Sequence, residues 1–259
     1  MVSQVVVVAG IGNGSGTGGA VARLFAKEGY TVALVSRGAE SLDVLARSIH
    51  ASGGKARRGL PNSRIRPRGA HSRLHCHPRA LLRPEYAVTA AIFNAGHAVW
   101  KPFLQVTPED VRESNKVNIE GSFAFARAAI LAFQTNELVP KTGKKGTLVF
   151  TGATASLRGN LITSAFASGK FAVRALSQSL AKEFGKENIH VAHAIIDGGI
   201  ATGNDRGDRN SPPSGPVENP TPNLKLSPES IAASYLYLVN QERSAWTWEL
   251  DLRPAHEKW

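Results

Sequence analysis

The stretch VVVVAGIGNGSGTGGAVARLFAKEGYTVALVSR, residues 5–37, decides the fold of this chain of 259 residues. It opens with a β-branched run that is typical of a buried strand, and glycines follow that run at once. Apolar residues then recur at helical spacing (Val21, Leu24 and Phe25), and TVALVSR repeats the buried-strand pattern. Strand, glycine turn, helix and strand form a βαβ unit. We therefore predict an α/β fold with a doubly wound parallel sheet and helices on both of its faces.

The same alternation continues to the end of the chain. An amphipathic helix is expected over residues 164–185, and further strand patterns lie at residues 90–96, 146–153, 190–199 and 247–252. Thr107 and Pro108 supply an N-cap and an N1 proline for a long helix that should run through Asn118 toward Phe133. The sequence contains no internal repeat and no sign of a second domain. Residues 1–259 are therefore expected to form one domain of three αβα layers.

Composition supports a protein with a sizeable buried core, because 42% of the residues are hydrophobic. A single cysteine, Cys76, excludes an internal disulfide, and no Cys-x-x-Cys pair is present to bind zinc. No apolar run approaches the roughly 20 residues of a membrane helix. The N-terminus also lacks the basic flank of a signal peptide. We expect a cytoplasmic protein that has no membrane partner.

The net charge of +11 comes from one stretch of the chain. Between Val44 and Pro84 the sequence has ten Lys and Arg residues and no Asp or Glu, so the remainder is nearly neutral. The basic stretch lacks the interleaved aromatic residues that stack on RNA bases, and no nucleic-acid partner is expected. The three His and one Cys within residues 71–77 have no second ligand pair elsewhere. We therefore assign no metal site.

The glycines after the first strand predict a dinucleotide site. Without side chains they let the backbone approach a pyrophosphate, and the N-terminus of the following helix attracts that anion. The residues expected to contribute are Gly10, Gly12, Gly14, Gly16 and Gly18. At the end of the second strand an NAD site typically has a carboxylate that hydrogen-bonds the ribose 2′-hydroxyl. This chain has Arg37 there, which can pair with a 2′-phosphate, so we expect NADP(H) to be preferred and NAD(H) to be the alternative.

Five motifs, taken in order, resemble the short-chain dehydrogenase/reductase family over nearly the whole chain. They are the glycine turn, Asn94-Ala95-Gly96 after the fourth strand, Asn118, Lys170, and Asp197-Gly198-Gly199-Ile200-Ala201-Thr202 after the sixth strand. The resemblance implies a Rossmann-fold oxidoreductase that acts on a small-molecule substrate. Lys170 would hold the nicotinamide ribose, and Asn118 would anchor a proton-relay water.

The resemblance also implies the remaining contacts to the cofactor. Asn94, Ala95 and Gly96 would line the cofactor after the fourth strand. After the sixth strand the contacts would come from Gly198, Ile200 and Thr202, with the backbone near the last two at the nicotinamide carboxamide. Family members commonly pair through the helices that contain Asn118 and Lys170, which implies a homodimer or a homotetramer.

Two catalytic positions of that family carry residues without acid chemistry in this chain. Counting back four from Lys170 gives Phe166 in place of the proton-donating tyrosine, and a further thirteen gives Ala153 in place of a serine. Thr154 is a neighbouring hydroxyl, but an aliphatic hydroxyl is a far poorer acid than a phenol. Loss of a general acid costs about 10²- to 10⁴-fold in rate. With FTGATASLRG and FASGKF, the chain is similar to an atypical subgroup that has Phe at the tyrosine position.

Two functions from different classes follow from these residues. The first is an NADP(H)-dependent oxidoreductase that moves hydride to or from a carbonyl or alcohol, with impaired or altered acid catalysis. In that enzyme residues 203–223, which are rich in Pro, Asn and Gly, would form a surface loop that closes over the substrate. The second is a non-catalytic NADP(H)-binding sensor or scaffold protein.

Residues 57–84 depart from the pattern of the rest of the chain. Family order requires a third strand near residues 56–62 and then an amphipathic helix, yet three prolines interrupt the segment before Pro84 and no strand or helix periodicity is present. Its length is nonetheless suitable for both elements. One hypothesis is that the segment is an out-of-frame reading of a normal coding stretch, since a shift by one nucleotide can spell such a strand and helix. In that defective product the third strand would not form.

Overall fold

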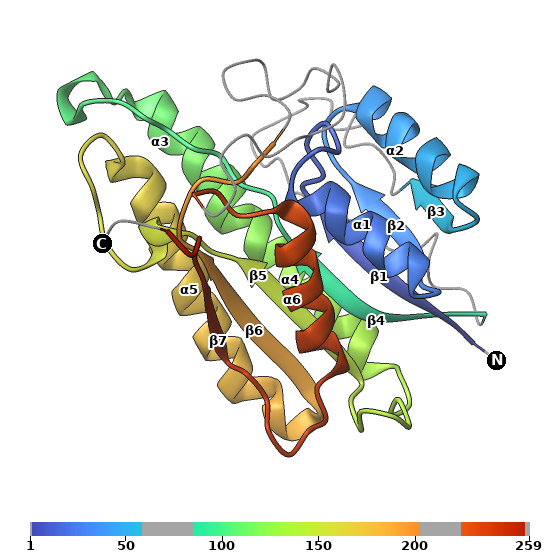
Figure 1. Cartoon of the computed structure of the whole chain (residues 1–259). Helices are drawn as coiled ribbons and strands as arrows, with labels where there is room; N and C mark the ends of the chain where they lie inside the picture. The colour runs from blue at the N-terminus through green and yellow to red at the C-terminus, as the bar shows by residue number, and fades with distance from the viewer. Residues whose placement is uncertain (1, 59–84, 203–223, 257–259) are drawn as a thin grey trace, which may run out of the picture.

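The computed structural model describes residues 2–58, 85–202 and 224–256, which form one α/β domain around a single sheet (Figure 1). All described strands pair in parallel, in the order β3-β2-β1-β4-β5-β6-β7. The strands are β1 (Ser3–Ala9), β2 (Thr31–Val35), β3 (Lys55–Arg58), β4 (Tyr86–Phe93), β5 (Gly146–Thr151), β6 (Ile189–Ile196) and β7 (Glu249–Leu252). This order is that of a doubly wound sheet, so the predicted fold class is confirmed.

Helices cover both faces of the sheet, as Figure 1 shows. One face carries α1 (Thr17–Lys27), α2 (Ala39–Ala51) and α6 (Pro228–Asn240), and the other carries α4 (Gly121–Gln134) and α5 (Ser164–Phe184). The chain reaches α4 through α3 (Pro108–Asn115). None of the helices in the described ranges has the length and hydropathy needed to cross a membrane.

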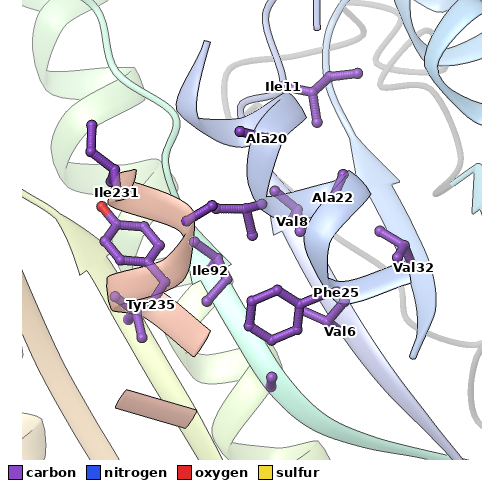
Figure 2. Close-up of a cluster of buried hydrophobic side chains, with 14 of the residues drawn as sticks. Val6, Val8, Ile11, Ala20, Ala22, Phe25, Val32, Ile92, Ile231 and Tyr235 are labelled. Atoms are coloured by element: carbon purple, nitrogen blue, oxygen red, sulfur yellow. The ribbon is translucent and has the colours of Figure 1, made fainter. Parts of the chain in front are cut away.

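The larger part of the core lies between the sheet and the helices α1 and α6 (Figure 2). Val6 and Val8 of β1 and Ile92 of β4 point toward these helices, which is the face expected from the alternation of side chains along a strand. Phe25 of α1 and Tyr235 of α6 are completely buried there. The apolar spacing that predicted α1 therefore identified its buried face.

The element between Thr107 and Phe133 differs from the single helix that we expected. Thr107 does cap its start, because its hydroxyl accepts a hydrogen bond from the amide of Asp110 at 3.2 Å. The α-helical hydrogen bonding is then interrupted by a π-helical turn over Lys116–Glu120, which separates α3 from α4. The interruption falls on Asn118, whose side chain is buried.

The third strand is present as β3, over Lys55–Arg58, where it pairs with β2 from Thr31 to Leu34. It begins one residue before the range predicted from family order. The third strand, which the frame-shift hypothesis expected to be missing, is therefore present over these four residues, while the frame shift itself stays a prediction. Residues 59–84 and 203–223, including the rest of the Arg-rich segment and the predicted substrate loop, lie outside the described residues.

Candidate functional site

The predicted site residues gather at the carboxyl-terminal edge of the sheet. All the described strands end there because they are parallel, and four of them are followed by Gly10 (after β1), Asn94 (after β4), Gly152 (after β5) and Asp197 (after β6). Between β1 and β4 the strand order reverses direction. In open α/β sheets ligands bind outside the carboxyl ends of the strands at such a reversal.

Gly10 and the residues after β4 are in direct contact. The Asn94 side-chain amide donates a hydrogen bond to the Gly10 carbonyl at 2.7 Å, and a Cβ on Gly10 would lie 2.6 Å from the Ala95 Cα. Because Gly10 also has a φ of +90°, a side chain there would be both strained and obstructed. The turn after β1 and the segment after β4 therefore form one continuous surface at this edge of the sheet.

The remaining predicted glycines lead into α1. A Cβ on Gly18 would approach the Gly10 carbonyl and lie 2.9 Å from the Ile11 Cα, so the start of the helix packs directly on the turn. Gly12 and Gly14 also have positive φ. Gly16 faces Thr202, since a Cβ on Gly16 would be 3.6 Å from the Thr202 methyl group. The structure thus brings the glycine turn next to the segment after β6.

The N-terminus of α1 has the features of an anion site. Gly16 at the N-cap has no side chain, so the first amide groups of the helix donate no hydrogen bond to a capping side chain. The Thr17 hydroxyl is buried, and it has no hydrogen-bond partner among the described residues. A buried, unpartnered hydroxyl beside uncapped amides fits a dinucleotide pyrophosphate. Thr17 is not among the residues predicted from sequence, although its position between Gly16 and Gly18 was a signal.

A second cluster joins Gly96, Asn118 and Lys170. A Cβ on Gly96 would be 3.6 Å from both the Asn118 Oδ1 and the Lys170 Nζ. Lys170 is 6% exposed, and its Nζ donates to the Thr151 carbonyl at 2.8 Å. Burial lowers the pKa of this ammonium from 10.5 to about 8. These three residues come from three separate segments and are brought together as the motifs predicted.

Asn118 is fixed by hydrogen bonds to a segment far away in the sequence. Its Oδ1 accepts from the His97 amide at 3.1 Å, and its Nδ2 donates to the His97 carbonyl at 2.9 Å. Its Nδ2 also lies 3.1 Å from the Ser114 Oγ. Gly169 of α5 packs against it, because a Cβ there would be 2.8 Å from the Asn118 Cβ. The π-helical turn thus places the Asn118 amide beside Lys170, and such turns occur frequently at functional sites.

The groups beside Lys170 supply little acid chemistry. Phe166 lies one helical turn before it, with its ring centroid 5.8 Å from the Lys170 Nζ and 5.9 Å from the ring of Trp100. Ala153 presents a methyl group, and its amide donates to the Ser156 Oγ at 3.1 Å. The Thr154 hydroxyl donates to the Asp197 carboxylate. Its proton is therefore already engaged.

Asp197 organises the segment after β6. It is 1% exposed, and its Oδ2 pairs with Arg253 at 2.8 Å and lies 3.9 Å from Arg158. Gly198 follows with a φ of +147°, and a Cβ there would be 2.8 Å from Pro254. Ile200 pairs with Leu226 in a parallel bridge. The predicted residues Gly198, Ile200 and Thr202 thus lie on one braced segment.

Arg37 follows the end of β2, next to the glycine turn. It is exposed and stands two residues beyond the end of β2, while the Gly10 amide donates to the Val35 carbonyl at 2.9 Å. The described residues therefore place Arg37 at the border of the glycine turn, on the side of β2. Among the residues described, no group of three or more His, Cys, Asp and Glu side chains is arranged to hold a metal ion, and residues 71–77 lie outside them.

Two comparisons with known proteins cover most of the chain. The model of the short chain dehydrogenase family matches residues 4–212. The 3-oxoacyl-(acyl-carrier-protein) reductase of Bos taurus is 28% identical over 196 residues, which is 76% of each chain. L-2,3-butanediol dehydrogenase of Corynebacterium glutamicum is 36% identical over 110 residues, but this match spans only 42% of this chain and 40% of that protein.

Solved structures agree with these matches. A short-chain dehydrogenase from Rhodopseudomonas palustris superimposes with a TM-score of 0.71 at 31% identity and covers 97% of this chain and 98% of its own. An alcohol dehydrogenase from Thermococcus sibiricus, complexed with 5-hydroxy-NADP, gives a TM-score of 0.76 at 23% identity over 99% of this chain and 98% of its own, a likeness of fold alone. The family model and the solved structures both match most of the chain, and the glycine turn and the cluster of Asn118 and Lys170 agree with them. The chain therefore belongs to the short-chain dehydrogenase family.

Proposed function

We propose that the chain is an NADP(H)-dependent oxidoreductase that moves hydride to or from a carbonyl or alcohol substrate. The observation that carries the proposal is the convergence of the Lys170 ammonium and the Asn118 amide at Gly96, on the same sheet edge as the glycine turn. Burying an ammonium lowers its pKa to about 8 and is unfavourable. Strongly shifted pKa values cluster at functional sites, which makes Lys170, at the edge with the glycine turn, a functional candidate.

The residues on this edge match the parts of a nicotinamide dinucleotide. Gly16 and Thr17 would hold the pyrophosphate, and Lys170 would bind the nicotinamide ribose. Arg37 would pair with a 2′-phosphate, since an exposed guanidinium can form a bidentate contact with it. The bound cofactor would supply or accept hydride at the nicotinamide C4. These assignments support NADP(H) as the preferred cofactor.

Among the described residues, the chain lacks an evident proton donor for the substrate oxygen. We infer that Phe166 and Ala153 occupy the positions where relatives carry tyrosine and serine. Neither residue can donate a proton, and the Thr154 hydroxyl is engaged with Asp197. Catalysis would therefore be impaired, or limited to a substrate that needs little acid assistance.

The same residues favour a second function, a non-catalytic NADP(H)-binding sensor or scaffold. Phe166 is packed between Lys170 and Trp100, which leaves an apolar ring where an acid would be needed. Binding through the glycine turn and Lys170 requires no acid. Turnover separates the two functions.

We also propose a homodimer or homotetramer that forms through α4 and α5. These helices carry large apolar side chains on their exposed surface: Phe123 is 55% exposed, Leu131 is 48% exposed and Phe171 is 43% exposed. Exposed apolar side chains on helices that cover the same face of the sheet suit an interface between copies of a chain. Lys170 lies on α5 and Asn118 lies in the π-helical turn just before α4, so pairing through these helices would brace both residues.

A restoration experiment tests the enzymatic proposal. Phe166→Tyr combined with Ala153→Ser replaces the two missing groups, and oxidation of NADPH is followed by absorbance with a panel of activated ketones and diketones. We expect the double variant to gain at least about 100-fold in rate, the lower end of what a general acid contributes. Lys170→Met in the same background is the control and should abolish the gain. A double variant that binds NADPH and remains inactive would favour the sensor or scaffold.

A further inference from the structure

A chain of charged and polar groups connects two strands, β6 and β7, to α5. Arg174 holds Glu249 of β7 through two hydrogen bonds, both 2.7 Å long. The Glu249 Oε2 lies 3.0 Å from the Nδ1 of His193 on β6. We call these three residues the Arg174–Glu249–His193 chain. Its first member lies one helical turn after Lys170, on the same side of α5.

The far end of this chain contacts the turn that follows β5. His193 is 1% exposed, and a Cβ on Gly152 would approach its Nε2 and lie 2.5 Å from its Cε1. Ser156 closes the other side, since its Oγ would be 2.9 Å from the same Cβ. The imidazole therefore packs directly against the Gly152 backbone.

Gly152 is joined to Lys170 through one peptide. The residue before it, Thr151, supplies the carbonyl that accepts the Lys170 hydrogen bond at 2.8 Å. The Gly152 amide in turn donates to the Ala194 carbonyl of β6 at 2.7 Å. The contacts thus form a closed ring from Lys170 through Gly152, His193 and Glu249 to Arg174 and back along α5.

The charge state of His193 suits a supporting role. Burial lowers its pKa to about 4, and the ammonium of Lys170 and the guanidinium of Arg174 act in the same direction, while Glu249 opposes them. The imidazole is therefore neutral near neutral pH, with the Nδ1 proton donated to Glu249. Its Nε2 has no hydrogen-bond partner among the described residues and faces the turn.

We propose that His193 is a positioning residue: anchored by Glu249 and Arg174, it holds the Gly152 backbone so that the Thr151 carbonyl keeps Lys170 aimed at the nicotinamide ribose. The inference rests on the proposed function, because it assigns the support of a residue that we place at the cofactor. It predicts that His193 affects the nicotinamide half of the site and not the adenine half. A residue needed only for folding would affect both halves.

His190 provides a matched control on the same strand. It is also 1% exposed, and burial lowers its pKa to about 4 as well. Its Nε2 lies 2.8 Å from the Thr247 carbonyl, and its ring stacks on Trp246 with centroids 4.9 Å apart. It lies an odd number of residues from His193 and so on the other face of the sheet. Replacing either histidine removes one buried imidazole from β6, but only one of them contacts Gly152.

The test measures the dissociation constants of NADPH and of 2′,5′-ADP, which lacks the nicotinamide half, for His193→Ala and His190→Ala. We expect His193→Ala to weaken NADPH binding by about tenfold and to change 2′,5′-ADP binding less than about twofold. His190→Ala should leave both ligands within about twofold of the unaltered chain. Thermal unfolding of each variant shows whether the two replacements destabilise the fold to a similar extent.

Each outcome of these titrations supports or refutes the positioning role of His193. Unchanged NADPH binding in His193→Ala, or equal loss of both ligands, would overturn the positioning role. If His193→Ala fails to fold, Glu249→Gln carries the same test, because it keeps the shape of the side chain and weakens the clamp on His193. Unchanged NADPH binding in that variant would also refute the inference. An unaltered chain that binds 2′,5′-ADP and NADPH equally would refute it too, while one that binds neither ligand would overturn the proposed function.

Discussion

Replacing Lys170 with methionine should stabilise the fold while it removes the group that we propose to hold the nicotinamide ribose. Burial lowers the pKa of the Lys170 ammonium from 10.5 to about 8. A shift of that size means that keeping the charge in the folded state costs about 3 kcal/mol near neutral pH. Methionine has a similar shape and no charge, but it loses the hydrogen bond to the Thr151 carbonyl, worth about 1 kcal/mol. We expect the free energy of unfolding to rise by about 2 kcal/mol.

This advantage should shrink as the pH rises. The unfolded lysine keeps its proton up to its ordinary pKa, whereas the folded lysine loses it near a pKa of about 8. Between these values the unfolded state binds more protons, so the unaltered chain gains stability with rising pH. From about pH 7 to about pH 9.5 the advantage of Lys170→Met should fall by about 2 kcal/mol. Lys144, whose pKa is lowered by burial to a similar value, is present in both proteins and cancels from the difference.

Urea unfolding followed by the fluorescence of the four tryptophans measures both free energies at each pH. The same samples are titrated with NADPH, which Lys170→Met should bind more weakly. A variant that is less stable than the unaltered chain near neutral pH would refute the reasoning. A stability difference that stays constant over this pH range would refute it equally, because it would mean that burial does not penalise the Lys170 charge.

Three further substitutions test other parts of the account. Arg37→Glu should weaken NADPH binding by at least about tenfold and leave NADH binding unchanged or improved, since a carboxylate repels a 2′-phosphate. Equal effects on the two dinucleotides in a fluorescence titration would contradict the role of Arg37. Phe25→Ala, at a completely buried side chain, should lower the free energy of unfolding by about 3–5 kcal/mol in urea denaturation, and a loss below about 1 kcal/mol would contradict the packing described for α1. Phe171→Glu should reduce the assembly to a smaller species in sedimentation experiments, and an unchanged species would move the proposed interface away from α5.

The parts of the fold that were predicted from sequence are those encoded by local pattern. The β-branched run before Gly10, the apolar spacing in α1 and the Thr107 cap each act within a few residues of chain. The π-helical turn at Asn118 could not be anticipated in this way. It accompanies hydrogen bonds to the His97 backbone, 21 residues away, which exist only once the chain has folded.

The same distinction applies to the site. Lys170, Asn118 and the glycines could be predicted because they stand at characteristic spacings. The partners of His193 could not, because Glu249 and Arg174 come from β7 and α5 and meet it only in the folded chain. Two histidines within the otherwise apolar run HVAHAII were the available signal, since a buried imidazole needs a partner. The match of Phe166 and Ala153 to the tyrosine and serine of relatives stays a prediction.

The central claim is that this sheet edge binds a nicotinamide dinucleotide with preference for the 2′-phosphorylated form. Titration of the full chain with NADPH and with NADH, followed by quenching of its tryptophans and by nicotinamide emission, tests that claim most directly. The account predicts saturable binding of NADPH at least about tenfold tighter than that of NADH. Binding of neither dinucleotide would contradict the account, and tighter binding of NADH would contradict the role given to Arg37.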